Sequence, residues 1–468
     1  MPANPAGQAA SSNPAAPSTP DAPVVPAAGK PLMRRIVVPP GRAFERGQIE
    51  RPGAFSADAL RAATSIVEDV RTRGDAALRD YTEKFDGVRL EGFRVPDAAI
   101  EAAVSQVGEG LAQALEAAAA HIRAFHERQR QQSWFCTRPD GALVGSMVSP
   151  LESVGVYAPG GRALYPSSVL MNAIPARVAG VERIVCVTPP AKDGSLDPAI
   201  LLACRIAGVT EVYSIGGAQA IAALAYGTES IAPVVKVTGP GNAYVAAAKK
   251  VVSGDVGIDM VAGPSEVCVV ADDTADPALV AIDLMAQAEH DPLASCYLVT
   301  FSGPFADAVE EAIGKHLASS PRAEITKASL ESQGLAIICP DLDTGLEAVN
   351  MIAPEHLEIH LEHAIDLLGS IRNAGAIFLG PWTPEAVGDY LAGPNHTLPT
   401  GGTARFSSPL SVDDFVKKSS VIQYSASALE NDAKAIVAIA DHEGLWAHAR
   451  SVEYRLAHQG TPAPARQQ

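Results

Sequence analysis

Short apolar runs alternate with alanine-rich segments through most of this chain after residue 149. Runs such as ESVGVYAP and RIVCVTPP have the length and β-branched content of strands, and the segments between them carry apolar residues at helical spacing. Such alternation is typical of βαβ units around a parallel sheet. A second series of the same kind starts at EVCVVAD and ends at AGAIFLG. The pattern predicts an α/β protein with two Rossmann-like parallel-sheet domains, at 149–258 and 259–392.

The two ends of the chain have a different pattern. Apolar positions recur at helical spacing over 57–85 and 97–129, so 34–148 is predicted to be a helical part that contributes to the first α/β domain. Residues 1–33 are rich in Pro, Ala and Ser and lack aromatic residues, which predicts a disordered tail. A loop rich in Gly, Pro and Thr opens the last part, so 393–468 is predicted to be a loop followed by a helical C-terminal tail.

Composition narrows the class of function. The chain has 468 residues and a net charge of −17, which argues against nucleic acid or an anionic membrane as its main partner and favours a small molecule. No signal peptide or bilayer-spanning run is evident, so we expect a cytoplasmic protein. Six widely spaced cysteines lack any CxxC pair and read as reduced, mostly buried thiols. A catalytic cysteine is disfavoured, because nothing beside any of them would stabilise a thiolate.

Glycine-rich turns follow the strands of the first series. They are APGG at 158–161, IGGAQA at 215–220 and GPGN at 239–242. Such turns expose backbone N–H groups at helix N-termini, where a pyrophosphate can bind. No GxGxxG fingerprint is present, because Tyr244 stands where the third glycine would be. Spacing alone leaves ordinary βα turns and a dinucleotide site equally open.

Two segments of the second series carry reactive side chains. AQAEHDP places Gln287 and His290 three residues apart at the expected end of a helix, so that both could reach one metal ion. Taken without the other motifs, this segment, in which Glu289 and Asp291 stand beside His290, is more often a solvated helix end than a metal site. In APEHLEIHLEH, Glu355 and His356 follow a proline and form a credible acid and base pair.

The histidines of APEHLEIHLEH also have the spacing of a helical metal face, since His356, His360 and His363 stand at i, i+4 and i+7. The alternating leucine and isoleucine between them predicts a strand instead. In a strand the three histidines would not share one face, so we reject a metal cluster there. Asn395 and His396 lie in GPNHTLPTGG, a loop that reads either as a mobile lid or as an exposed connection.

Several of these motifs together resemble one known family. AGPSE at 262–266, AQAEHD at 286–291, APEHLE at 353–358, GDY at 388–390 and the run GNAYVAAAKKVVSGDVGIDMVAGPSEV are similar to histidinol dehydrogenase, and the resemblance spans about 45–456. It implies a zinc and NAD enzyme that oxidises L-histidinol to L-histidine through L-histidinaldehyde, the last step of histidine biosynthesis. It also implies two NAD consumed per substrate and one zinc ion per subunit.

The resemblance also implies roles for single residues. It makes Glu355 and His356 the catalytic pair. The residues it assigns to NAD are Tyr157, Gln219 and Asn242. The residues it assigns to zinc are Gln287, His290, Asp389 and His448. The residues it assigns to the substrate are Ser265, Gln287, His290, His356, Asp389, His396, Glu443 and His448. Four histidines have no such match and are expected on the surface: His121, His126, His316 and His458.

The resemblance further implies a homodimer with an exchanged C-terminal tail, so that His448 and Glu443 serve the partner's site. Three rival functions are weaker. A zinc and NAD dehydrogenase for another small alcohol would keep the zinc and the base but change the residues that recognise imidazole. A zinc hydrolase would leave Tyr157, Gln219 and Asn242 without a role. A silent binding protein would have lost a ligand or the base, and none is lost.

Overall fold

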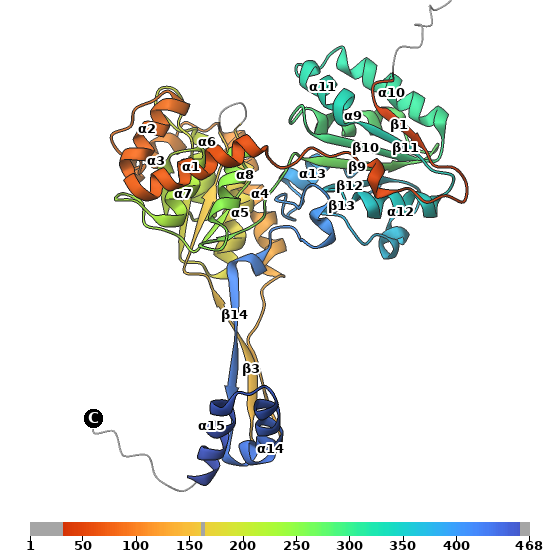
Figure 1. Ribbon diagram of the computed structural model, residues 1–468. Coiled ribbons are helices and arrows are strands. Elements are labelled where there is room, and N and C mark those ends of the chain that lie inside the picture. Colours follow the sequence, from red (N-terminus) through yellow and green to blue (C-terminus); the bar gives the residue numbers. More distant parts are fainter. Residues whose placement is uncertain (1–30, 161–163, 459–468) are drawn as a thin grey trace, which may run out of the picture.

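The computed structural model describes residues 31–160 and 164–458, which form two α/β units and a projecting third part (Figure 1). Residues 1–30 of the predicted tail at 1–33, and Gly161 of the APGG turn, lie outside these residues. Within the described part, no helix is long and apolar enough to cross a membrane.

The first α/β unit is built on a five-stranded parallel sheet in the order β6-β5-β4-β7-β8. Its strands are β4 (Ser153–Tyr157), β5 (Arg183–Thr188), β6 (Glu211–Ser214), β7 (Lys236–Thr238) and β8 (Gly257–Ile258). One face packs against α3 (Asp97–Val104), α4 (Glu109–Glu127), α5 (Pro166–Ala179) and α6 (Pro198–Ala207). The other face packs against α1 (Ala57–Arg73), α2 (Asp75–Asp86), α7 (Gly217–Tyr226) and α8 (Ala243–Val252). Because β5 and β7 flank β4, the strand order reverses beside β4.

The second α/β unit has a six-stranded parallel sheet in the order β1-β11-β10-β9-β12-β13. Its strands are β1 (Arg34–Val37), β9 (Glu266–Ala271), β10 (Ser295–Thr300), β11 (Leu335–Ile338), β12 (His356–His360) and β13 (Ala376–Leu379). One face packs against α9 (Pro277–Ala288), α10 (Gly303–Leu317) and α11 (Ala323–Gln333). The other packs against α12 (Leu342–Ile352) and the 3-10 helix η2 (Ala364–Ser370). The predicted α/β class with parallel sheets is confirmed.

The N-terminal part departs from its prediction in two ways. Each long helical stretch is two helices, and α1 ends just before Gly74, whose φ of 55° combined with a ψ of −131° suits glycine. Strand β1 pairs with β11, and Met33 is fully buried, so both belong to the second unit rather than to a tail or to the first domain. A partner about 300 residues away leaves no local trace in a four-residue strand. The predicted boundaries at 149, 259 and 393 stay predictions.

The third part is a three-stranded antiparallel sheet in the order β14-β3-β2, capped by two helices. Its elements are β2 (Trp134–Thr137), β3 (Leu143–Pro150), β14 (Val416–Gln423), α14 (Ala426–His442) and α15 (Trp446–Ala457). Figure 1 shows the paired β3 and β14 running away from both α/β units, with α14 and α15 at their far end. The C-terminal helices are as predicted. The three strands were not, because their residues are exposed or half-exposed on both faces and lack a clean alternation of buried and exposed positions.

Short elements complete the connections around the second unit. They are α13 (Glu385–Tyr390) and the 3-10 helices η1 (Arg46–Gln48), η3 (Thr403–Arg405) and η4 (Val412–Phe415).

Candidate active site

A cavity of 780 Å³ lies between the two α/β units and gathers most of the chemically reactive motifs. From the first unit it is lined by the GPGN turn and by Lys249 and Asp259, a buried ion pair that holds this turn. The residues that line it from the second unit and the following loop include Ser265, Gln287, His290, Glu355, His356, Glu385, Asp389 and His396.

The two sheets present opposite ends to this cavity. Tyr157 ends β4 and GPGN follows β7, so the first sheet contributes the carboxyl ends of strands beside its reversal point, the usual ligand position in such a sheet. The second sheet contributes amino ends, because Glu266 opens β9 and His356 opens β12. Helix α9 runs back along that sheet, and its last turn therefore brings Gln287 to the same edge.

The candidate metal ligands of the body converge. Gln287 is fully buried in α9, and His290 lies two residues past the helix end. Ligand atoms of His290, Glu385 and Asp389 lie within 4.8 Å of one another. Imidazole, carboxylate and amide donors without a thiolate suit a zinc ion that keeps positions for a substrate. The residues present therefore fit the metal that the motifs predict.

His356 has one ring nitrogen engaged and one free. Its Nδ1 lies 3.2 Å from the backbone carbonyl oxygen of Glu266 and 2.9 Å from the side-chain amide of Gln287. Its Nε2 is buried without a hydrogen-bond partner among the described residues and lies 4.0 Å from Asp389 Oδ1. Burial lowers the pKa of His356 to about 4, although Asp389 opposes this. The ring is therefore neutral near pH 7 and able to accept a proton.

Glu355 is a buried carboxyl that faces the same cavity. Burial raises its pKa well above the usual range, while the N–H of Glu266, which donates to Oε2 at 2.9 Å, acts in the opposite direction. Behind it, Arg51 donates to the Glu266 carboxylate and to the carbonyl oxygen of Ile352 at the end of α12. Both Glu355 and His356 are buried, so they are not a solvent-exposed loop pair.

The three predicted cofactor residues surround the turns of the first unit. Tyr157 is buried, and its hydroxyl accepts a hydrogen bond of 3.1 Å from Gly217 N. Gln219 lies in the first turn of α7 with its amide oxygen buried and unpaired among the described residues. Asn242 caps α8 by accepting from Tyr244 N and Val245 N. Only Asn242 lines the cavity itself, and the other two shape the neighbouring βα turns.

The loop that carries His396 is neither exposed nor a free connection. Asn395, Thr397 and Thr400 are buried, and Asn395 donates to the carbonyl oxygen of Met171 at 2.6 Å. His396 Nδ1 lies 3.0 Å from the backbone carbonyl oxygen of Asp389, so the ring packs against the metal-type cluster. The structure thus places His396 in the cavity and contradicts an exposed connection.

Two predicted residues do not reach this cavity within the chain. Glu443 and His448 are exposed and lie on α14 and α15, at the far end of the projecting sheet (Figure 1). The described body of one chain therefore gathers three of the four predicted zinc ligands.

The remaining histidines occupy separate places. His356, His360 and His363 do not form one cluster: His360 contacts Asp283 and Glu358, and His363 is exposed. The expectation that His126 lies on the surface is wrong, because it is fully buried and its Nδ1 donates to the carbonyl oxygen of Ile122. A histidine on the apolar face of α4 signals burial, which the helical spacing could have indicated.

Glu385, Glu266 and Arg51 contribute to the site but were not predicted. Glu385 stands four residues before Asp389 in α13, a spacing that puts both on one helix face. Such a pair also reads as a solvated acidic face, so the spacing was ambiguous.

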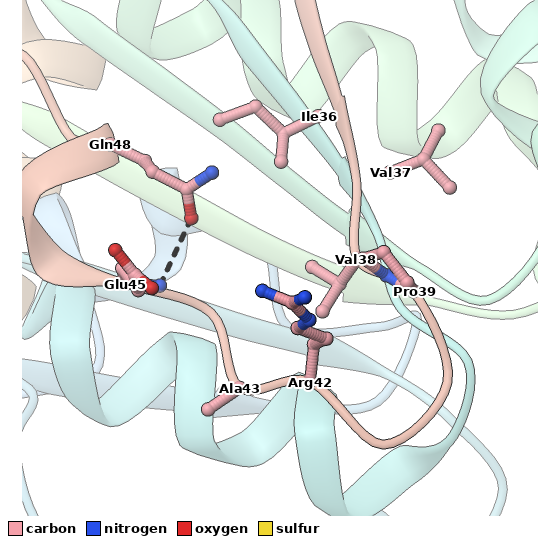
Figure 2. A pocket seen from close by; sticks show the side chains of 8 residues that line it. All are labelled: Ile36, Val37, Val38, Pro39, Arg42, Ala43, Glu45 and Gln48. Atoms are coloured by element: carbon pink, nitrogen blue, oxygen red, sulfur yellow. Dashed lines mark hydrogen bonds between the residues drawn. The ribbon is translucent and has the colours of Figure 1, made fainter.

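Two further cavities lie beside the N-terminal segment. One, of 370 Å³, is shown in Figure 2, where the Gln48 side chain accepts from Glu45 N at the start of η1. The other, of 690 Å³, is lined by Phe44 and by residues of α12. Neither is lined by a histidine, cysteine, serine or aspartate, so the shared cavity is the candidate active site.

Comparisons with known proteins agree on one family. The model of histidinol dehydrogenase matches residues 49–456. The histidinol dehydrogenase of Bacillus subtilis (strain 168) is 56% identical over 391 residues, 84% of this chain and 92% of the relative. That of Chlorobaculum tepidum is 50% identical over 90% of this chain and 98% of the relative. A crystal structure of histidinol dehydrogenase from Elizabethkingia anophelis superposes with a TM-score of 0.87 at 36% identity, covering 93% of this chain and all of that one.

Family match, sequence identity and fold thus all lead to one assignment. The chain belongs to the histidinol dehydrogenase family, the NAD-dependent, metal-using oxidoreductases of histidine biosynthesis.

Proposed function

We propose that this enzyme oxidises L-histidinol to L-histidine in two successive steps through L-histidinaldehyde, with one zinc ion per chain and two NAD per substrate. One observation carries the proposal: the buried, neutral His356 presents a free Nε2 beside the cluster of His290, Glu385 and Asp389, in a cavity that also reaches the GPGN turn. An alcohol oxidation of this kind needs a base, a set of residues able to bind a metal ion and a turn able to bind the cofactor, all at one cavity.

The chain's own groups handle the protons of both steps. When bound, NAD accepts hydride and zinc anchors the polar nitrogens of the substrate near the reacting carbon. His356 takes the hydroxyl proton at Nε2 as the carbinol hydrogen leaves as hydride, which gives the aldehyde. Glu355 in its ionised form, a stronger base than an ordinary carboxylate because its pKa is raised, then removes a proton from a water that adds to the aldehyde. The protonated His356 returns its proton to the aldehyde oxygen, which gives the diol. His356, neutral again, deprotonates the diol as a second hydride leaves to a second NAD, and the resulting acid releases its proton to give the carboxylate.

The remaining assignments belong to the same proposal. Tyr157, Gln219 and Asn242 would hold NAD. Ser265 and His396 would contact the substrate, because both line the cavity beside Gln287 and His290. The cytoplasm is the proposed location, since all six cysteines are free and five of them are buried, as in a reducing compartment.

We infer that two chains share each site. Within the described residues, α14 and α15 pack on one another, Asp432 of α14 accepts hydrogen bonds from Arg138 and Tyr424 beside the projecting strands, and neither helix forms an extensive contact with the α/β units. Their exposed apolar side chains include Ile439, Trp446 and Tyr454, more than an isolated helix pair would leave in water. An exchange of tails would cover them and bring His448 and Glu443 to the partner's cavity.

Metal content tests the division of roles. Asp389→Ala should lose both zinc and activity, whereas His356→Ala should keep its zinc and lose activity, because only the first residue is proposed to ligate. Zinc loss in the His356 variant with retention in the Asp389 variant would overturn these roles.

A substrate panel tests the rival functions. A dehydrogenase for another small alcohol would form NADH from that alcohol and not from L-histidinol, and a zinc hydrolase would act without NAD. Reduction of NAD by zinc-loaded enzyme with L-histidinol, abolished by chelation and restored by zinc, would exclude both.

A further inference from the structure

Glu385 is a buried carboxylate at the candidate active site to which the proposed reaction gives no task. It opens α13, is 4% exposed and lines the cavity. Among the ion-pair contacts of the described residues, its only basic neighbour is His356, whose Nδ1 lies 3.7 Å away and whose ring is neutral near pH 7. The other charges around it are the carboxylates of Asp389, Glu355, Glu358 and Asp283. A carboxylate held among other carboxylates is costly, so a local function must account for it.

The backbone of Glu385 is firmly anchored. Its N–H donates to Glu358 Oε1 at 2.7 Å. The other oxygen of Glu358 lies 3.4 Å from His360 Nε2, which also lies 3.3 Å from Asp283 Oδ2 of α9. The start of α13 is thereby tied to β12 and to the helix that carries Gln287. The Cα of Glu385 is consequently held in place, and its side chain lies next to the Gln287 amide.

The contacts of Gln287 define which way its amide faces. One atom of the amide lies 3.2 Å from Glu385 Oε2, 3.2 Å from the Glu266 carbonyl oxygen and 2.9 Å from His356 Nδ1. With Glu385 ionised, both oxygens accept, so the amide atom between them is the nitrogen, whose two protons go to these two oxygens. His356 Nδ1 keeps its own proton and donates it to the Glu266 carbonyl oxygen, which leaves Nε2 free as the base. The carbonyl oxygen of Gln287 then points away from Glu385. Only this oxygen can ligate a metal.

We propose that Glu385 is a positioning residue that holds the Gln287 amide with its nitrogen turned inward, which leaves the amide oxygen for the metal bound by His290 and Asp389. The inference rests on the proposed ligand set. A neutral acceptor at 385 would do this less well, because an amide there could present either its oxygen or its nitrogen to Gln287. Glu385 itself is near enough to His290 and Asp389 to be a ligand instead. Exchanging the amide of residue 287 and the carboxylate of residue 385 distinguishes the two roles.

The test is a double-mutant cycle on zinc retention. Wild type, Glu385→Gln, Gln287→Glu and the double variant are loaded with zinc and dialysed against a graded chelator series, and metal per chain is measured. Gln287→Glu changes a proposed ligand and places two carboxylates side by side, so it should weaken zinc retention at least about tenfold. Glu385→Gln removes an outer-shell partner and should also weaken retention, by about tenfold. The double variant has the carboxylate at 287 and the amide at 385, so a donor again faces an acceptor. Its zinc retention should return to within about threefold of wild type.

Additive effects, with the double variant no better than Gln287→Glu, would overturn the proposal, as would unchanged retention in both single variants. Glu362→Gln, on an 80% exposed side chain, is the matched control and should keep wild-type retention. Unfolding of the metal-free proteins checks that each variant is folded. Asp389→Ala in the same assay separates the claims: if it keeps zinc, the proposed ligand set fails, and if only the 287–385 coupling is absent, the positioning role alone fails.

Discussion

At the scale of single residues, burial has the largest influence on the reactive side chains. It lowers the pKa of His356 and raises that of Glu355, because burial disfavours the charged form of each group. Neighbouring charges modify this effect but do not set it. The site therefore depends on a dry setting, which the packed ends of two sheets supply.

His360 should give a measurable pH dependence of stability. Burial opposes its charged form, but the carboxylates of Asp283 and Glu358, at 3.3 and 3.4 Å from Nε2, outweigh burial and raise its pKa to about 9. Because this exceeds the usual value of about 6.5, the stabilisation is complete below pH 6.5 and is lost as pH rises through 9. His360→Gln should lower the free energy of unfolding by about 2 to 3 kcal/mol at pH 6 and by little at pH 10. Urea unfolding at fixed protein concentration tests this, and an equal loss at both pH values would contradict it.

Asn242 combines a structural and a proposed cofactor task, which can be separated. Asn242→Ser keeps an N-cap acceptor for α8, so its melting temperature should stay close to that of wild type. Asn242→Ala removes the acceptor and should lower the free energy of unfolding by about 1 kcal/mol. Both variants should raise the KM for NAD several-fold, because neither side chain reaches as far as asparagine. If Asn242→Ser restores the KM along with stability, Asn242 acts only as a cap.

Sequence motifs predicted residues that follow distinctive backbone features, such as Glu355 and His356 after a proline or Gln287 and His290 at a helix end. They did not reveal Glu385 or Arg51. The task of each depends on a partner distant in sequence, Gln287 for the first and Glu266 for the second, and no local pattern encodes that partner.

At the scale of elements, the βα turns of the first unit depend on close backbone approach. Gly239 has a φ of +112°, and a Cβ there would lie 2.2 Å from the carbonyl oxygen of Tyr157. Gly254 has a similar φ of +107° with nothing within 4 Å of such a Cβ, which makes it a matched control. Gly239→Ala should therefore destabilise the protein by at least about 2 kcal/mol more than Gly254→Ala. Chemical unfolding compares them, and equal effects would show that only backbone strain matters.

The same scale shows what a sequence pattern can predict. The alternating strands and helices of both α/β units were predictable because each element shows its own periodicity within a few residues. Strands β1, β2, β3 and β14 were not predictable. β3 and β14 pair over eight residues although they stand some 270 positions apart, and such pairing depends on the whole fold.

At the scale of the whole molecule, the projecting C-terminal tail contributes no described residue of α14 or α15 to the cavity of its own chain. If tails are exchanged, His448→Ala damages the site of the partner, whereas His356→Ala damages the site of its own chain. Subunits of the two inactive variants, mixed and re-associated, should then regain about a quarter of wild-type activity, because half of the dimers are mixed and each has one intact site. If each tail served its own chain, the mixture would stay inactive. Either variant re-associated alone is the control.

The number of NADH formed per L-histidinol consumed tests the central claim most directly, since it distinguishes a four-electron oxidation at one site from a simple alcohol oxidation. Purified, zinc-loaded enzyme with limiting L-histidinol and excess NAD should form two NADH per substrate without free aldehyde. One NADH per substrate with aldehyde released, or none at all, would contradict the proposed reaction.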